Sequence, residues 1–226
     1  QRQMCIRDRE QGAAIQGNLQ TMHDAIVTNG KFEKGQTVFI QGATSGVGLI
    51  GLQIAKSLGA SKVLGSSTNK SKLNKLKEYG ADVLIDTSSE YWLDEVLKAT
   101  NGDGVDILID MLSGNYVNKN MEATKIHGHL VNIGRLAGMS GNFNYDLHAK
   151  RRLHYIGTTG RTRSIEENEM VASLANKDLW ESVLAGKIRH VIHKSMHLRE
   201  AKEALNIMNK NSHFGKIILF TDQFLY

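Results

Sequence analysis

The sequence predicts an α/β fold, a doubly wound parallel sheet followed by a short C-terminal return segment. Three observations lead to this fold class. From Gln36 onward, short apolar segments alternate with amphipathic segments of helical period. A glycine-rich loop, "QGATSGVG", separates the first apolar segment from the first helix. Several further segments of both kinds follow before residue 160, and strands that alternate with helices form parallel sheets.

The first strand and helix flank the glycine-rich loop. Residues 38–40 are β-branched or aromatic and lie between glycines, which indicates a buried strand. Apolar residues recur at helical spacing from Val47 to Leu58, and Gly59 ends that helix. The loop has the spacing G-x-x-x-G-x-G, which departs from the dinucleotide pattern G-x-G-x-x-G. On these residues alone, a tight turn that packs a helix on a sheet remains the alternative to a phosphate site.

The later strands and helices follow in alternation. Strands are predicted at 62–65, 82–85, 105–110, 129–134 and 154–157, and helices around 73–79 and 92–97 and after Gly114. Ligands of such sheets bind at the carboxyl ends of the strands. Those ends are predicted at Gly42, Ser66, Asp86, Met111, Gly134 and Thr158.

The C-terminal part is predicted to add helices and return strands. A helix is predicted at residues 164–186, and Ser164 and Glu167 are expected to cap its N-terminus as a capping box. A strand near residues 191–192, a helix over 201–208 and an apolar strand at 217–220 follow. The first ten residues are polar and lack helical or strand period, which indicates a non-native leader. The predicted organisation is leader 1–10, joining segment 11–35, nucleotide-binding domain 36–160, and C-terminal helices and return strands 161–226.

Composition excludes several classes of protein. The 226 residues are 41% hydrophobic and 23% charged, without an apolar run of membrane-spanning length or a signal-peptide pattern, so we expect a cytoplasmic protein with no membrane partner. The net charge of +5 comes without a basic run, so no nucleic-acid partner is expected. The single cysteine, Cys5, excludes an intrachain disulfide and a Cys-rich zinc site.

The end of the second predicted strand indicates which nicotinamide nucleotide binds. Folds selective for NAD place Asp or Glu there, to accept a hydrogen bond from the ribose 2′-hydroxyl. The sequence "GSSTNKSK" has none. Ser66, Ser67, Lys70 and Lys72 instead supply hydroxyl donors and positive charge, which suit a 2′-phosphate. The sequence therefore predicts NADP as cofactor, and a solvated helix start with a serine N-cap is the alternative.

Other catalytic and metal motifs are incomplete. The Gly-Lys pairs are not followed by Ser or Thr, so no P-loop is formed, and no G-x-S-x-G elbow is present. His190 and His193 would point to opposite faces of a strand, so we interpret them, with His197, as surface or core histidines rather than metal ligands. Asp110 lies at the cofactor end of its strand, where we expect it to position the turn.

Five quoted segments together carry a family resemblance. "GQTVFIQGATSGVG", "GSSTNKSKLNKLKEYGAD", "ILIDMLSG", "HLVNIGRLAG" and "FGKIILF" resemble the zeta-crystallin-like NADPH:quinone oxidoreductase branch of the medium-chain dehydrogenases/reductases. The likeness covers about residues 11–221 and implies a Rossmann domain. In the zinc-dependent alcohol dehydrogenases a cysteine ligand lies on the joining segment. The matching place, around Gly17 and Asn18, has no such ligand, so the resemblance points to a zinc-free protein with no bound metal.

The resemblance also implies roles for individual residues. Residues 44–48 would bind the pyrophosphate, Ser66 and Lys72 the 2′-phosphate, and residues 133–136 the nicotinamide side. Thr158, Thr159 and Asn211 are weaker matches, and Thr87 stands where some members have a tyrosine beside the adenosine phosphate. The predicted cofactor-binding residues are Thr44, Ser45, Gly46, Val47, Gly48, Ser66, Ser67, Lys70, Lys72, Met111, Ile133, Gly134, Arg135, Leu136, Thr158 and Asn211.

The implied activity is NADPH-dependent hydride transfer to a quinone or an α,β-unsaturated carbonyl, by a homodimer paired through the edge strand at 154–160. No catalytic residue is identified. Family members begin with a barrel-like substrate domain, so we expect this chain to be a fragment that binds NADPH without reducing quinones. An enoyl-thioester reductase and a non-enzymatic NADP-binding module remain open. A short-chain dehydrogenase is disfavoured, because no tyrosine has Lys four residues later.

Overall fold

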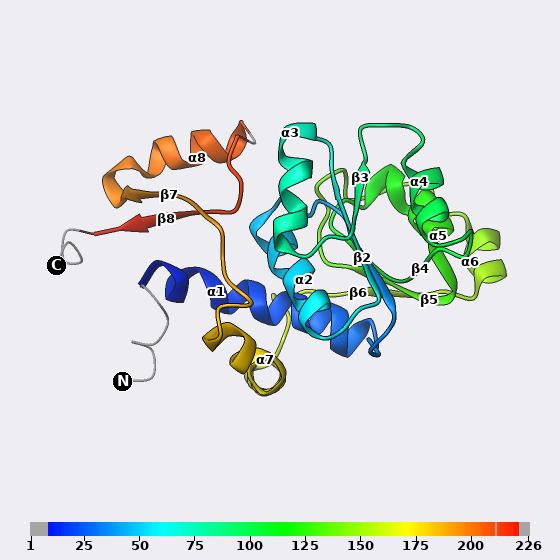
Figure 1. Ribbon diagram of the computed structural model, residues 1–226, viewed down its shortest axis with the longest axis horizontal. Coiled ribbons are helices and arrows are strands. Elements are labelled where there is room, and N and C mark those ends of the chain that lie inside the picture. The colour runs from blue at the N-terminus through cyan, green and yellow to red at the C-terminus, as the bar shows by residue number, and fades with distance from the viewer. Residues whose placement is uncertain (1–8, 211, 222–226) are drawn as a thin grey trace.

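Six parallel strands form the central sheet of the protein (Figure 1). The computed structural model describes residues 9–210 and 212–221. The strand order is β3-β2-β1-β4-β5-β6, and every neighbouring pair is parallel, so the predicted doubly wound Rossmann sheet is confirmed. The strands are β1 (Thr37–Ile40), β2 (Lys62–Ser67), β3 (Val83–Asp86), β4 (Val105–Asp110), β5 (Thr124–Asn132) and β6 (His154–Gly157).

The strand order reverses between β1 and β4. Because β1 continues to β2 on one side while β4 continues to β5 on the other, the loops after β1 and β4 diverge at their carboxyl ends. Such a switch point is the place at which open α/β sheets bind ligands. The glycine-rich loop follows β1 directly, so it lies at this switch point.

Helices cover both faces of the sheet. The crossovers contain α2 (Gly46–Ser57), α3 (Lys70–Leu73), η3 (Asn74–Tyr79), α4 (Trp92–Ala99), η4 (Gly114–Tyr116), α5 (Val117–Ala123) and α6 (Tyr145–Arg151). One buried cluster joins α1, α2 and η3 to the sheet, and a second joins α4 and α5 to its other face around Phe39 and Trp92. Within the described residues, no helix is both long and apolar enough to span a membrane.

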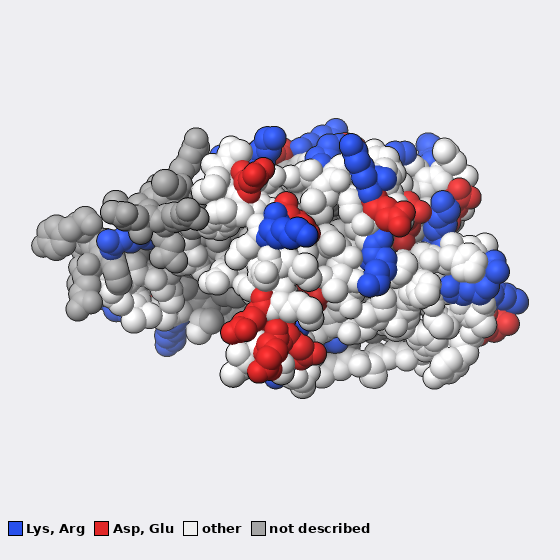
Figure 2. Space-filling model, turned by 90° about the horizontal axis from the view of Figure 1, so that it is seen from below, with Lys and Arg blue, Asp and Glu red and all other residues white. Residues whose placement is uncertain are grey.

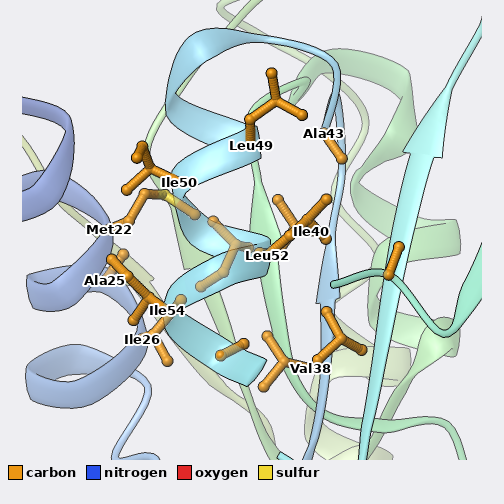
Figure 3. Packing of buried hydrophobic residues seen from close by; sticks show 14 of the residues in the cluster. Met22, Ala25, Ile26, Val38, Ile40, Ala43, Leu49, Ile50, Leu52 and Ile54 are labelled. Atoms are coloured by element: carbon orange, nitrogen blue, oxygen red, sulfur yellow. The ribbon is translucent and has the colours of Figure 1, made fainter. Parts of the chain in front are cut away.

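The segment before the sheet is helical. α1 (Arg9–His23) continues as a π-helical stretch, η2 (Asp24–Asn29), and packs on α2. Figure 3 shows Met22 of α1 beside Ile50 of α2. Gly51 permits this contact, because a Cβ on Gly51 would lie 2.0 Å from Met22 Cε. α1 includes Arg9 and Glu10, the last two residues of the range set apart as a leader, and residues 1–8 lie outside the described part.

The C-terminal return segment forms a small sheet of its own. After α7 (Ile165–Leu184), β7 (Ile192–His197) pairs in parallel with β8 (Lys216–Phe220), with η5 (Leu198–Glu200) and α8 (Ala201–Asn209) between them. The capping box at α7 is confirmed, because Ser164 Oγ accepts from Glu167 N and Glu167 Oε2 accepts from Ser164 N. Figure 1 shows this two-stranded sheet apart from the main one.

Two glutamines attach the start of the return segment to the helices of the main domain. Gln53 of α2 donates to the Arg189 carbonyl at 3.0 Å and accepts from Arg189 N at 2.9 Å. Gln11 of α1 makes the equivalent pair with His190 O and N, at 2.9 and 2.8 Å. Each side-chain amide thus satisfies both main-chain groups of one residue, as a neighbouring strand does.

On the face shown in Figure 2, Lys and Arg side chains lie among Asp and Glu side chains. The described part of this face has no continuous basic surface.

Candidate functional site

The glycine-rich loop begins at the end of β1 and passes directly into α2. Gly42 has a φ of +60°, which favours glycine, and its amide donates to Ser66 Oγ of β2 at 3.2 Å. Ser45 is the N-cap of α2, and its Oγ accepts from Gly48 N at 3.0 Å. A Cβ on Gly48 would lie 2.6 Å from Ala43 Cα, so the loop requires glycine there.

The first two amides of α2 are unpaired. Within the described residues, Gly46 N and Val47 N donate no hydrogen bond. These N–H groups stand at the positive end of a twelve-residue helix, where a phosphate is both hydrogen-bonded and attracted by the helix dipole. Thr44 lies beside them, with its Oγ1 3.4 Å from Ser67 Oγ. The structure therefore brings together predicted residues 44–48.

Lys216 of β8 lies across this loop and was not predicted. A Cβ on Gly46 would lie 3.1 Å from Lys216 Cε and 3.2 Å from its Cγ and Cδ, so the lysine stem packs along the glycine. A β-bridge between Ser45 and Gly215 holds the start of β8, and with it Lys216, against the glycine loop. Among the described residues, no carboxylate lies within ion-pair distance of Lys216, and burial lowers the pKa of its ammonium. The stem of a half-buried lysine therefore lies beside the N-terminus of α2, an arrangement that favours an anion there.

The predicted 2′-phosphate residues divide into two kinds. Ser66 is fully buried, and its hydroxyl holds the Gly42 amide. Ser67 is also buried, and its Oγ accepts from Asn69 N at 3.1 Å. In this arrangement both hydroxyls shape the glycine loop and the turn after β2. The N-cap of α3 is Asn69, whose Oδ1 accepts from Ser71 N and Lys72 N, rather than the serine of the alternative interpretation.

The two lysines of this turn also differ. Lys72 is buried, and burial lowers the pKa of its ammonium. Lys70 is exposed and pairs with Asp86, at the end of β3, at 3.5 Å. Hydrogen bonds from Ser88 hold the pKa of the Asp86 carboxyl below its usual range. The turn after β2 therefore presents two cations, with one carboxylate on the neighbouring strand.

Asp110 positions the turn after β4, as predicted. Its Oδ1 accepts from Leu112 N and Ser113 N, both at 2.8 Å, and Asn132 Nδ2 donates to its Oδ2 at 3.2 Å. The carboxyl is fully buried, and burial raises its pKa above the usual range. Ser113 has a φ of +58° and donates to Gly134 O at 2.8 Å, so this network joins the loops after β4 and β5.

The predicted nicotinamide-side residues lie on these joined loops. Ser45 Oγ is 3.7 Å from Met111 Sδ, which connects the glycine loop to β4. A Cβ on Gly134 would lie 2.9 Å from Met111 O, so the two loops meet backbone to backbone. Ile133 N donates to Asp110 O, and Leu136 N to Met111 O, while the Leu136 side chain is exposed. Arg135 lies on the same loop, Thr158 N donates to Asn132 O, and Asn211 lies outside the described residues.

The histidines of the return segment do not form a metal site. His190 precedes β7 rather than lying on it; it is buried, and Asn18 Nδ2 is 3.2 Å from its Nε2. Burial, with a smaller effect of the Lys216 charge, lowers the pKa of His190 to about 4. Within residues 9–210 and 212–221, no three His, Cys, Asp or Glu side chains are grouped to hold a metal ion.

Comparison with known proteins identifies the domain. Residues 46–176, more than half of the chain, match the family described as zinc-binding dehydrogenase. The chain belongs to this family. The family is part of the medium-chain dehydrogenase/reductase superfamily of oxidoreductases, and the matched region is its nicotinamide cofactor-binding domain. The superfamily assignment made from the sequence is thus confirmed.

Individual relatives are more distant. The chain is 26% identical to an NAD-dependent alcohol dehydrogenase of Sulfurisphaera tokodaii over 85% of its length and 53% of the relative's. It is 23% identical to quinone oxidoreductase-like protein 2 homolog of Nematostella vectensis, over 94% and 58% of the two lengths. A quinone oxidoreductase structure from Pseudomonas syringae shares the fold, with a TM-score of 0.82 at 23% identity, over 93% of this chain and 64% of that one. The chain thus spans little more than half of these curated relatives.

Proposed function

We propose that this domain binds NADPH and positions it for hydride transfer to a quinone or an α,β-unsaturated carbonyl. The observation that carries the nucleotide assignment is that the unpaired amides at the start of α2 and the side chain of Lys216 meet at the switch point. Gly46 and Val47 present the unpaired amides, and the methylene stem of Lys216 packs along Gly46. A pyrophosphate carries two negative charges and fits this arrangement.

The proposed roles of the residues follow from their places. Gly46, Val47 and Lys216 hold the pyrophosphate, and Lys72 attracts the 2′-phosphate. The buried Asp110 network fixes the backbone of the loops after β4 and β5, where the nicotinamide would lie. The bound nucleotide supplies the hydride, and the protein supplies position and shielding from water.

Nucleotide titrations test the choice of cofactor. With two cations at the turn after β2, we expect NADPH to bind at least about tenfold more tightly than NADH, or about 1.4 kcal/mol. Lys72→Met should remove most of that preference, and Lys98→Met, on the exposed side of α4, should leave it unchanged. Equal dissociation constants for the two nucleotides with the unaltered protein would count against NADP.

A second titration tests the pyrophosphate site. Lys216→Met should weaken NADPH, NADH and ADP-ribose by about the same factor of ten, because all three contain the pyrophosphate. The matched control is Lys194→Met, an exposed lysine on the paired strand β7. Undiminished ADP-ribose binding by the Lys216 variant would exclude the proposed anion site.

Hydride transfer is tested on the protein encoded by the full reading frame. We expect enzyme-dependent NADPH oxidation with quinones or enones, without added zinc and without stoichiometric zinc by elemental analysis. A panel that includes enoyl thioesters identifies the acceptor class. Oxidation of simple alcohols with bound zinc would instead assign the chain to the alcohol dehydrogenases.

We also propose a homodimer. β6 is an edge strand, and the Tyr155 ring on it is exposed and stacks on Phe143, with ring centroids 5.7 Å apart. An exposed edge favours pairing with a second copy. Light scattering should give twice the monomer mass, and a monomeric mass at high micromolar concentration would contradict the proposal.

A further inference from the structure

A polar cleft of about 330 Å³ lies between η2, the carboxyl end of β6 and the start of α7. Its volume is at the lower end of the range for small-molecule sites, which is about 300–1,000 Å³. η2 is a π-helix that continues α1, and short π-helical stretches of this kind frequently mark functional sites. The cleft is lined mainly by polar residues, which include Asp24, Thr28, Asn29, Thr158, Thr162 and Arg163.

A buried ion pair stands in the wall of the cleft. Only 6% of the Asp24 side chain is exposed, and its Oδ2 accepts a hydrogen bond from Arg163 Nη2. The other carboxylate oxygen, Oδ1, accepts no hydrogen bond from the described residues. It is not sealed from solvent, because in this part of the chain the sealed and unpaired side-chain atoms are all histidine nitrogens. Asp24 therefore offers one open acceptor, and the Arg163 guanidinium, 19% exposed, keeps further N–H donors beside it.

Hydroxyl groups form much of the remaining wall. Within residues 9–210 and 212–221, the hydroxyls of Thr28, Thr158 and Thr162 make no hydrogen bond. The hydroxyl of Thr159 accepts from Arg161 N, at 3.2 Å. Each threonine hydroxyl can donate one hydrogen bond and accept others. The cleft thus presents several donors and acceptors that the described chain does not pair internally.

The charges and contacts of the cleft indicate the class of ligand. Two carboxylates, of Asp24 and Glu167, line it together with one guanidinium, so an anion is disfavoured. A wholly apolar ligand would leave the open polar groups unpaired. Two neighbouring hydroxyls fit, because one can donate to Asp24 Oδ1 while the other accepts from Arg163. Met170 and Val171 add apolar surface for the C–H groups of such a ligand.

We propose that this cleft binds a neutral polyol of monosaccharide size, at a site separate from that of the nucleotide. The inference goes beyond the proposed function and does not depend on it, because no group of the glycine loop or of the turn after β2 takes part. The nucleotide itself is another source of the same chemistry, since its nicotinamide ribose carries neighbouring hydroxyls and Thr158 is among the predicted cofactor-binding residues. Competition between sugar and nucleotide distinguishes the two sources.

Calorimetry on the unaltered protein measures the binding of D-glucose, D-galactose and D-ribose, with cyclohexanol and glucose 6-phosphate for comparison. At least one sugar should bind saturably and more tightly than either comparison compound. Thr28→Val, which replaces one hydroxyl of the cleft by a methyl group, should weaken that sugar by about five- to tenfold. The control is Thr68→Val, an exposed threonine between β2 and α3, and it should leave the affinity unchanged. Saturating NADPH should also leave the dissociation constant of the sugar unchanged.

Several results would overturn the site. They are the absence of saturable binding by all three sugars, equally tight binding of either comparison compound, and full affinity of the Thr28→Val protein. Displacement of the sugar by NADPH would assign the cleft to the ribose of the nucleotide and would also overturn it. A protein that binds a sugar but neither NADPH nor NADH would support the site and contradict only the proposed function.

A second measurement applies if Thr28→Val does not fold by circular dichroism. Hydrogen exchange is then followed on the unaltered protein with and without the sugar. Sugar-dependent protection of the amides of residues 157–162 supports the site. Protection confined to other residues, or no protection, overturns it.

Discussion

Replacement of Gly48 by alanine tests the backbone geometry of the glycine loop. The added Cβ would lie 2.6 Å from Ala43 Cα and 2.9 Å from Ala43 C and O, and all three are backbone atoms that no rotamer change can move away. Overpacking of this kind costs about 1–3 kcal/mol, and we expect the upper end because the backbone must shift. Alanine regains about 1 kcal/mol of helix propensity. The net loss is about 2 kcal/mol, or roughly 4–8 °C in Tm for a chain of this size.

Two other glycines serve as matched controls. At Gly46 the added Cβ meets only the flexible Lys216 side chain, at 3.1 Å, so Gly46→Ala should leave stability nearly unchanged. At Gly17, an exposed position in α1, a Cβ meets nothing within 4 Å, so Gly17→Ala should stabilise by about 0.5–1 kcal/mol. Thermal unfolding gives the Tm of each of the three variants, and titration with NADPH gives the dissociation constant of each. A Gly48→Ala protein as stable as the Gly17→Ala protein would refute the reasoning.

Three further predictions concern buried polar groups. Because the folded pKa of His190 is depressed to about 4, its contribution to stability is complete above pH about 6.5 and is lost as pH falls toward 4, by up to about 3 kcal/mol. Urea unfolding at pH 7 and pH 5 should show this loss, and His190→Gln should reduce the difference between the free energies of unfolding at the two pH values. If the variant shows the same difference as the unaltered protein, His190 is not the cause. Asp110→Ala leaves two turn amides without their acceptor and should destabilise by about 2–5 kcal/mol in the same assay, and a loss below 1 kcal/mol would show that water replaces the carboxylate. Gln53→Ala should weaken NADPH binding and speed amide exchange in β8 while leaving β1 protected; equal exchange in both strands would indicate global unfolding instead.

The sheet was predictable because its determinants are local. Each strand is a short apolar segment next to a glycine or a polar turn, and six such segments in alternation with helices permit few other arrangements. The role of Asp110 also followed from local sequence, since its partners Leu112 and Ser113 are two and three residues away.

The lysine from the return segment could not be predicted in the same way. Lys216 and Gly46 are 170 residues apart in the sequence, and only tertiary packing brings them together. The sequence contained Lys216 within "FGKIILF", but nothing in that segment indicates that the side chain crosses the glycine loop. Ser66 shows the reverse case. Its residue type suits a phosphate ligand, whereas its hydroxyl is buried and holds Gly42, because strand β2 places it under the loop.

The two glutamine attachments determine what can move within the molecule. Residues 189 and 190 are bound to α2 and α1 through Gln53 and Gln11, so the position of β8 depends on those helices as well as on the β-bridge of Gly215 to the glycine loop. A tilt of α1 would pull on the His190 backbone through Gln11, and Lys216 would follow, because its amide bonds to the adjacent Val191 carbonyl. A contact made on the outer flank of α1 would thereby alter the electrostatic potential over the amides of Gly46 and Val47, and with it the local affinity for anions.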